Sequence, residues 1–201
     1  MPRDNKARAD RFAAFRHKSY TYYWLARLLS AMAMQVIAVA VGWQIYDLTR
    51  NPLDLGLIGL TQFVPALALL LVTGAAADRF SRRMIMAICE IAGLVLGALM
   101  LLLTLGGLTS PLPVFAILVA LGVTRAFFSP ASTSLAPNLV PKEDLANAIA
   151  WNSTSWQTAT IAGPVAGGLL YGLGATVPYL VATFLFTLAT VFILVIPKPP
   201  Q

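Results

Sequence analysis

The sequence predicts an all-α integral membrane protein with six transmembrane helices. Of its 201 residues, 58% are hydrophobic and 11% are charged, whereas a soluble domain carries about 25% charged residues. The apolar runs are close to the 20 or so residues that an α-helix needs to cross a hydrocarbon core of about 30 Å. Runs of this length favour helices over barrel strands, because backbone in lipid must satisfy its own hydrogen bonds.

The first segment, residues 1–22, combines basic with aromatic side chains. A basic stretch before an apolar run is also typical of a secretory signal, but the run at 23–46 is too long for one and lacks a clear cleavage site. We therefore expect a cytoplasmic arm followed by an uncleaved transmembrane helix, with the tyrosines and Trp24 at the lipid headgroups.

The later apolar runs predict five more helices, separated by short connectors in which Pro and Gly supply the turns. The six predicted spans are 23–46, 55–77, 84–105, 112–135, 145–172 and 178–196. Residues 197–201 are expected to begin a cytoplasmic linker.

The basic residues predict the orientation. Six crossings place the arm, the second and fourth connectors and the C-terminus on one side of the membrane. Eleven of the fourteen Lys and Arg residues fall on that side, and Arg50 falls on the other. The positive-inside rule makes the richer side cytoplasmic.

Composition also excludes several classes of function. The net charge of +6 comes from basic residues in the gaps between apolar runs, which is the pattern of membrane topology, so we expect no nucleic-acid partner. One histidine, His17, and one cysteine, Cys89, cannot build a metal cluster. The sequence has no phosphate-binding loop and little material for a catalytic site. It therefore predicts no enzyme and no cofactor, and transport would draw on an ion gradient.

The connector between the second and third predicted helices carries the pattern Gly-x-x-x-Asp-Arg-x-Ser-Arg-Arg, formed by Gly74, Asp78, Arg79, Arg82 and Arg83. It resembles the motif at this place in the major facilitator superfamily of transporters, with serine where that family usually has glycine. The resemblance implies a gate: glycine allows close helix approach, the aspartate accepts from a cation or a helix N-terminus, and the arginines hold the turn at the lipid surface. A merely topogenic loop explains the arginines but not Gly74 with Asp78.

The fifth predicted helix contains a second motif, formed by Gly163, Pro164, Gly167 and Gly168. It is similar to the core of the antiporter signature found in exporters of the same superfamily. Small residues let helix backbones approach, and a proline inside a helix bends it. Glycine and proline are also common in membrane helices generally, and the earlier glycines of the full signature are not all present.

Further stretches resemble the exporter branch called transmembrane secretion effectors. They are 15–17 with 24–27, 41–49, 127–131 and 138–141. This resemblance implies half of a twelve-helix fold: an N-terminal six-helix bundle, built as a 3+3 inverted repeat, with substrate bound between two such bundles near the midplane. It also implies a bacterial inner (plasma) membrane.

Charged residues within the predicted helices are candidates for substrate or proton coupling. Arg125 is expected roughly 15 Å deep and Glu90 roughly 10 Å deep, from the 1.5 Å rise per residue. The two can pair, and a purely structural ion pair is an equal alternative. Arg27, near the cytoplasmic end of the first helix, is a further candidate, although it can also snorkel to the headgroups.

Several uncharged polar or aromatic residues can face a cavity or make interhelical hydrogen bonds equally well. They are Gln35, Gln44, Asn152, Trp156 and Gln157.

These observations lead to one functional hypothesis with alternatives. The chain is expected to be, or to be half of, a proton-coupled exporter of small molecules that works by alternating access. Its partners would be the lipid bilayer, a small-molecule substrate, and either a second copy or a missing C-terminal half. The alternatives are a truncated half-transporter without function and a membrane partner subunit without transport activity.

Overall fold

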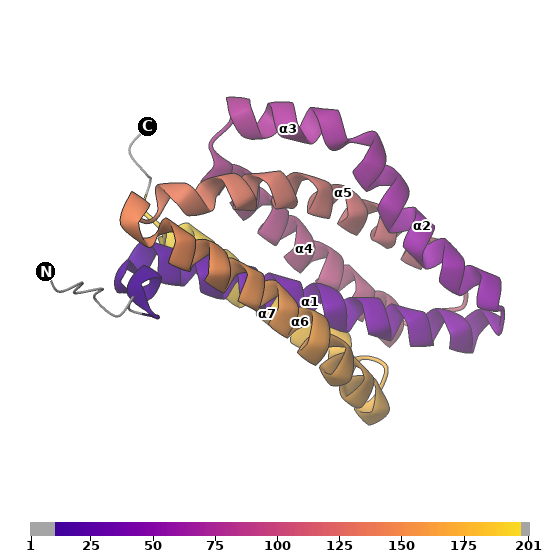
Figure 1. The fold of residues 1–201 in the computed structure, drawn as a ribbon. Helices are drawn as coiled ribbons and strands as arrows, with labels where there is room; N and C mark the ends of the chain where they lie inside the picture. Colours follow the sequence, from indigo (N-terminus) through magenta and orange to yellow (C-terminus); the bar gives the residue numbers. More distant parts are fainter. Residues whose placement is uncertain (1–10, 198–201) are drawn as a thin grey trace, which may run out of the picture.

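The structure, a computed structural model that describes residues 11–197, is an all-helical bundle with no strand in that range (Figure 1). The predicted all-α class is therefore confirmed. The helices are η1 Ala13–Arg16, α1 Lys18–Thr49, α2 Pro52–Ala68, α3 Leu70–Arg79, α4 Arg82–Leu105, α5 Leu112–Leu135, η2 Ala136–Asn138, η3 Lys142–Asp144, α6 Leu145–Leu173 and α7 Val177–Val195, where η denotes a 3-10 helix.

Local sequence explains where the helices begin and end. Arg50 ends α1 in the left-handed region with φ 52°, and Asn51 then caps α2 by accepting a hydrogen bond from the Leu53 amide at 3.1 Å. Pro52 occupies the first turn of α2. Backbone N–H groups in that turn have no partner within the helix, so proline loses no hydrogen bond there. The α6 helix ends at Gly174, whose φ is 148°. Glycine suits this position, because a residue with a side chain rarely adopts that backbone conformation.

The first predicted boundary is wrong in one respect: residues 18–22, assigned to the arm, already belong to α1. The expectation that the tyrosines lie at the headgroups is also wrong for two of them. Tyr20 and Tyr23 are fully buried, because their hydroxyls donate to the carbonyls of Ala148 and Ser132 at 2.7 and 2.8 Å. Residues 1–10 and 198–201, which hold the rest of the predicted arm and most of the predicted linker, lie outside the described residues.

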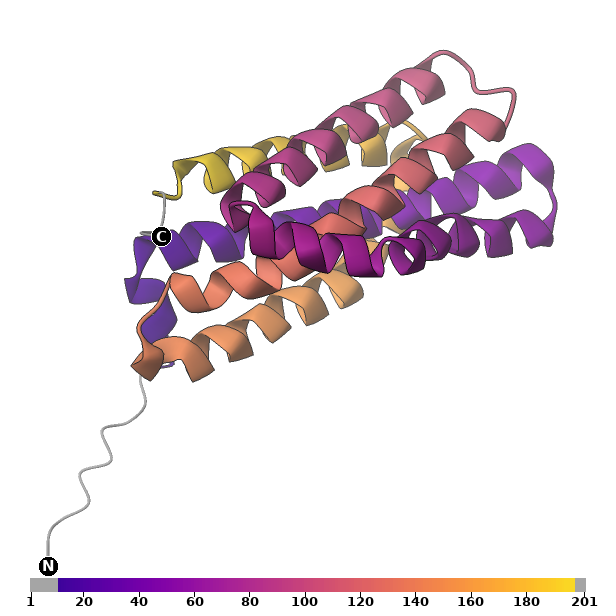
Figure 2. The same cartoon turned by 90° about the horizontal axis from the view of Figure 1, so that it is seen from above.

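The single helix predicted at 55–77 is instead two helices, α2 and α3, which meet at Leu69. Pro65 explains the interruption, because it has no N–H to donate and its ring crowds the preceding turn. Hydrogen bonding continues across the break, since the Thr73 amide donates to the Leu69 carbonyl at 2.8 Å. Both helices lie along α5 (Figure 2), and the chain bends where they meet (Figure 1).

Four of the described helices are long and apolar enough to cross a membrane: α1, α4, α5 together with η2, and α7. The α2 helix is apolar but has only 17 residues. The α6 helix has 29 residues and is not among the four, and its first half is rich in serine, threonine, asparagine and glutamine. Six crossings therefore stay a prediction.

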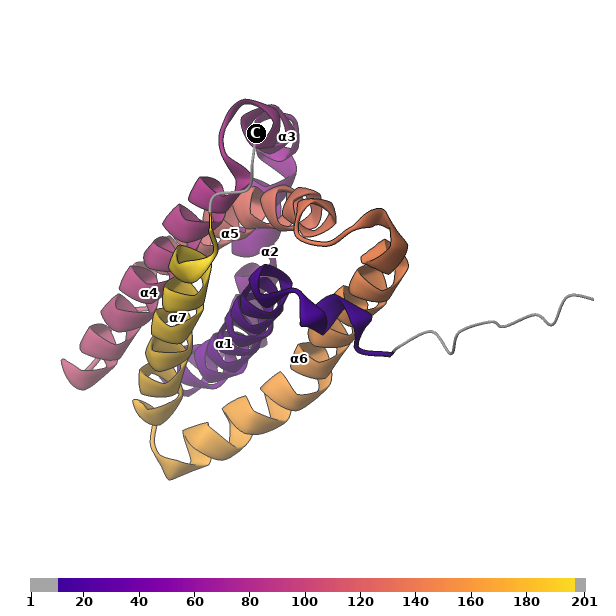
Figure 3. The same cartoon turned by 90° about the vertical axis from the view of Figure 1, so that its left-hand side faces the viewer.

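The bundle is organised around α1. Seen end-on, α1 lies between α6 and α7, with α5 beside them and α4 outside, against α5 and α7 (Figure 3). The start of α1, the α3–α4 turn, the η2–η3 connection and the end of α7 all lie at one end of the bundle (Figure 1). We call this the basic end, because Arg16, Lys18, Arg79, Arg82, Arg83 and Lys142 are located there.

Candidate functional site

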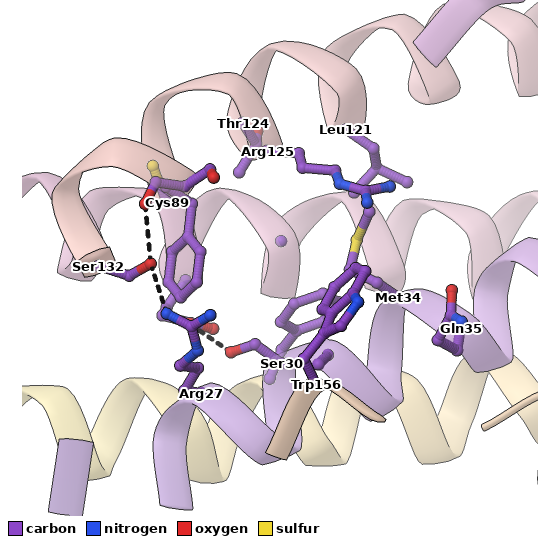
Figure 4. A pocket seen from close by; sticks show the side chains of 16 residues that line it. Arg27, Ser30, Met34, Gln35, Cys89, Leu121, Thr124, Arg125, Ser132 and Trp156 are labelled. Carbon is purple, nitrogen blue, oxygen red and sulfur yellow. Dashed lines mark hydrogen bonds between the residues drawn. The ribbon is translucent and has the colours of Figure 1, made fainter. Parts of the chain in front are cut away.

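A cavity of about 390 Å³ opens inside the bundle (Figure 4). Its walls come mainly from α1, α4 and α5, with Trp156 from α6 and Phe186 from α7. All three charged residues predicted for coupling, Arg27, Glu90 and Arg125, line this one cavity although they are on three different helices. Their roles stay predictions, but the structure brings the side chains together.

Arg27 is held by neutral groups. Its guanidinium donates to the Tyr23 hydroxyl at 3.2 Å and to the Ser132 hydroxyl at 3.1 Å. Tyr23 lies one turn earlier on α1, whereas Ser132 is in the last turns of α5. Arg27 therefore points into the bundle and links α1 to α5, and this position differs from the snorkelling alternative.

Glu90 is the most deeply buried charged side chain among the described residues, with 1% of its surface exposed. Its Oε1 accepts a hydrogen bond from the Ser30 hydroxyl on α1. Its Oε2 has no hydrogen-bond partner in the described part of the chain. A buried carboxyl oxygen without a partner is costly, so it marks a place where a proton or a ligand donor can bind.

Arg125 lies on α5, where its guanidinium stacks over the Trp156 ring with 5.4 Å from Cζ to the ring centroid. No ion pair joins Arg125 to Glu90 in the described part of the structure, so the pairing expected from sequence is not made. The separation follows from the neighbours of each group, since Trp156 holds the guanidinium and Ser30 holds the carboxyl.

The basic turn between α3 and α4 serves mainly to cap other helices. Arg82 donates to the Ser134 carbonyl at the end of α5 at 3.1 Å. Arg83 donates to the Ile193 and Leu194 carbonyls at the end of α7 at 3.1 and 2.6 Å. These carbonyls lie in the last turns of their helices, where backbone donors run out, so cationic donors stabilise both helix ends.

The other members of the predicted gate are not engaged in this way. A Cβ at Gly74 would meet no atom within 4 Å, so the close helix approach expected there is not made among the described residues. Arg79 is exposed in the last turn of α3. The side chain of Asp78 lies outside the part that the structure describes, and its role stays a prediction.

The α6 motif does bring two helices together. A Cβ at Gly163 would overlap the Gln35 side chain, and one at Gly167 would lie 3.2 Å from the Val36 carbonyl oxygen of α1. Pro164 lies between them inside the helix. Gly168 is different, because a Cβ there would meet nothing within 4 Å. The first two glycines therefore set the close contact of α6 with α1.

Comparison with known proteins places this bundle in a family. The sequence profile of the transmembrane secretion effector family matches residues 9–199. The chain belongs to that family, a branch of the major facilitator superfamily. The predicted resemblance is therefore confirmed, and with it the assignment to integral membrane proteins.

The relatives are export proteins. Macrolide efflux protein A of Streptococcus pyogenes is 26% identical over 195 residues, which cover 94% of this chain and 47% of that protein. Enterobactin exporter EntS of Shigella boydii serotype 18 is 29% identical over 208 residues, which cover 92% of this chain and 45% of that protein. The chain thus spans about half the length of the curated relatives it matches. These relatives are transporters, which confirms that the chain is not an enzyme.

Sequence reasoning missed the hydroxyl groups that organise the site of this secretion effector. Ser30 and Ser132 hold Glu90 and Arg27, and neither was a candidate. A signal was present for Ser30, because it lies three residues after Arg27 and so on the same face of α1. Of the polar residues expected to face a cavity, Gln35 and Trp156 line it.

The other polar candidates lie elsewhere. Gln44 bonds to Thr104 and Tyr179, Asn152 accepts from Tyr20 at 3.3 Å, and Gln157 is exposed. Interhelical hydrogen bonding is therefore the better account of Gln44 and Asn152.

Proposed function

We propose that the chain forms the N-terminal six-helix half, a 3+3 inverted repeat, of a proton-coupled exporter of small amphipathic molecules. Alternating access would take place around the cavity between α1, α4 and α5. The observation that carries the proposal is the meeting of Arg27, Glu90 and Arg125 in one cavity inside an otherwise apolar bundle. Burying ionisable groups inside a membrane costs free energy, so their presence in this cavity favours a role in transport.

Proton coupling is assigned to Glu90. Its unpartnered Oε2 is the atom that would gain and lose the proton, and the Ser30 hydroxyl holds the other oxygen in place. Arg27 lies one turn from Ser30 on the same face of α1, so a deprotonated Glu90 has a guanidinium within the same cavity. Exchange of that proton would drive the change between inward and outward openings.

A complete transporter needs a second bundle, supplied by a C-terminal half or by a second copy of this chain. The family's relatives are about twice as long as the matched region. Gly74 on α3 and Gly168 on α6 leave open space at their Cβ positions, which suits close packing of further helices. The α3–α4 turn would then close against the second bundle at the cytoplasmic side.

The test is accumulation of two probes, a labelled macrolide and enterobactin, in bacterial cells that lack their own pumps for them. Cells that insert the chain in the inner membrane, alone or joined to a second six-helix half, are expected to accumulate at least about threefold less of one probe, a difference that a protonophore abolishes. Glu90→Gln should abolish it as well. The matched control is Glu143→Gln, which makes the same change in the exposed η3 and should leave export intact.

Unchanged accumulation of both probes in both arrangements would refute the exporter. Export that persists with a protonophore, or in Glu90→Gln, would refute proton coupling at this residue. Co-purification with one fixed partner in the absence of export would favour a partner subunit.

A further inference from the structure

The α5–α6 wall of the cavity carries a guanidinium stacked on an indole. Arg125 from α5 lies over the ring of Trp156 from α6 (Figure 4). Both side chains remain accessible, Trp156 with 44% of its surface exposed. No carboxylate or carbonyl in the described range accepts from Arg125. Stacking uses the face of the guanidinium and leaves its edge of N–H donors free.

A second arginine, Arg50, is also stacked on an aromatic ring, and it has an acidic neighbour. Arg50 lies over the Tyr46 ring at 5.8 Å, outside the cavity, and its Nη2 is also 3.7 Å from an oxygen of Asp47. Arg125 has the same kind of aromatic support but no such anion. Its N–H donors are therefore available to a negatively charged group that is not part of the described residues.

The charge of the whole cavity points the same way. Two guanidinium groups, of Arg27 and Arg125, face one carboxyl group, of Glu90. The lining is therefore positive whether or not Glu90 carries its proton. Glu90 is held by Ser30 on α1, whereas Arg125 stacks on Trp156 of α6. Such an excess of positively charged donors favours an anionic ligand.

Size and surface define the rest of the ligand. A cavity of about 390 Å³ is within the range that holds a drug-sized molecule. Its remaining lining is largely apolar and includes Met34, Phe128 and Phe186. Aromatic rings favour offset or edge contacts with another ring, so a flat hydrophobic body fits beside the stacked pair.

We propose that this cavity binds amphipathic organic anions, with the carboxylate or sulfonate at the edge of Arg125 toward Arg27 and an aromatic body beside Trp156. The inference deepens the proposed function and rests on it, since it names the substrate class of the same cavity. Arg125 sets the charge of the ligand, and Trp156 fixes the plane of the guanidinium and contacts the ring.

The test is equilibrium binding of three labelled probes to the purified chain in nanodiscs: 2-naphthylacetate, 2-naphthylmethylammonium and 2-naphthylethanol. They share one body and differ in charge. We expect the acetate to bind at least about tenfold more tightly than the ammonium, the size of one charge-assisted hydrogen bond. Arg125→Gln should remove most of that preference and leave ethanol binding within about twofold. Trp156→Leu should weaken all three probes.

The matched control is Arg50→Gln, which removes the stacked arginine outside the cavity and should leave the preference unchanged. Helix content by circular dichroism verifies that each variant is folded, and Arg125→Lys supplies a second variant that keeps the charge but loses the planar fork. It should show an intermediate preference.

Equal or tighter binding of the ammonium, or a preference that survives in folded Arg125→Gln, would overturn the proposal. Binding needs no transport, so the two proposals fail separately. A chain that prefers the acetate but exports nothing would refute the exporter alone. An active exporter without the preference would refute the anion site alone.

Discussion

The α3–α4 turn and the middle of α6 both carry glycine motifs typical of transporters, but their glycines meet different surroundings. Gly163 and Gly167 lie against α1, where a side chain would overlap Gln35 or approach the Val36 backbone. Gly74 faces open space. Gly163 and Gly167 are therefore used in a helix contact inside this bundle, whereas Gly74 is not, although Arg82 and Arg83 of the same turn cap α5 and α7. The two motifs thus differ in whether their glycines make a close helix contact among the described residues.

The largest effect is expected from Gly163→Leu. The new side chain would occupy the space of the Gln35 side chain, and overpacking of a tight contact costs about 1–3 kcal/mol or somewhat more. The thermal unfolding midpoint in detergent, followed by circular dichroism, should fall accordingly. The control, Gly168→Leu, lies five residues along the same helix where a Cβ meets nothing. Equal midpoints for the two variants would contradict the assigned contact.

A smaller loss is expected from Arg83→Met, which removes two donors from the end of α7. Each hydrogen bond from a charged group contributes about 1.5–3 kcal/mol, and exposure to solvent at this end lowers the total to about 1 kcal/mol. Arg79→Met is the control, because Arg79 is exposed and has no partner among the described residues. If both substitutions lowered the midpoint equally, the arginines would act through charge alone and not as caps.

The smallest effect on unfolding is expected from Gly74→Leu. It creates no clash in the bundle and improves helix propensity, so stability should stay the same or rise by up to about 1 kcal/mol. The difference in accumulation expected in the probe assay should nevertheless be lost, because the substitution would block closure against a second bundle. Full export in Gly74→Leu, or in Asp78→Asn, would reject the gate and end the contrast between the two motifs.

The sequence was most informative at helix ends, where a single proline or glycine determines the backbone conformation. Apolar runs bounded by Pro111, Pro178 or Gly174 locate helix ends well, since these residues fix or forbid particular backbone angles. The sequence also indicated that Arg27, Glu90 and Arg125 would come together, because ionisable groups in apolar membrane helices face the interior of the bundle. The functional role of each of these three residues remains a proposal.

What sequence could not predict depends on contacts between distant segments. Pro65 could be read as tolerated in a membrane helix, and only the structure shows that the helix ends at Leu69 one turn later. Charge and depth alone allowed Arg125 and Glu90 to pair, but in the structure Arg125 stacks on Trp156 and Glu90 accepts from Ser30. No local pattern specifies which neutral side chain lies opposite a charge.

The arginine caps at the basic end have a consequence for the order of folding. Arg83 binds carbonyls that lie 110 and 111 residues later in the chain, and Arg82 binds one that lies 52 residues later. A protein is synthesised from its N-terminus, so both arginines are made well before the helices they cap. During synthesis neither arginine has its helix end to bind. Arg83 can make its bonds only after α7 is in place, and closure of this end is therefore a late step of assembly.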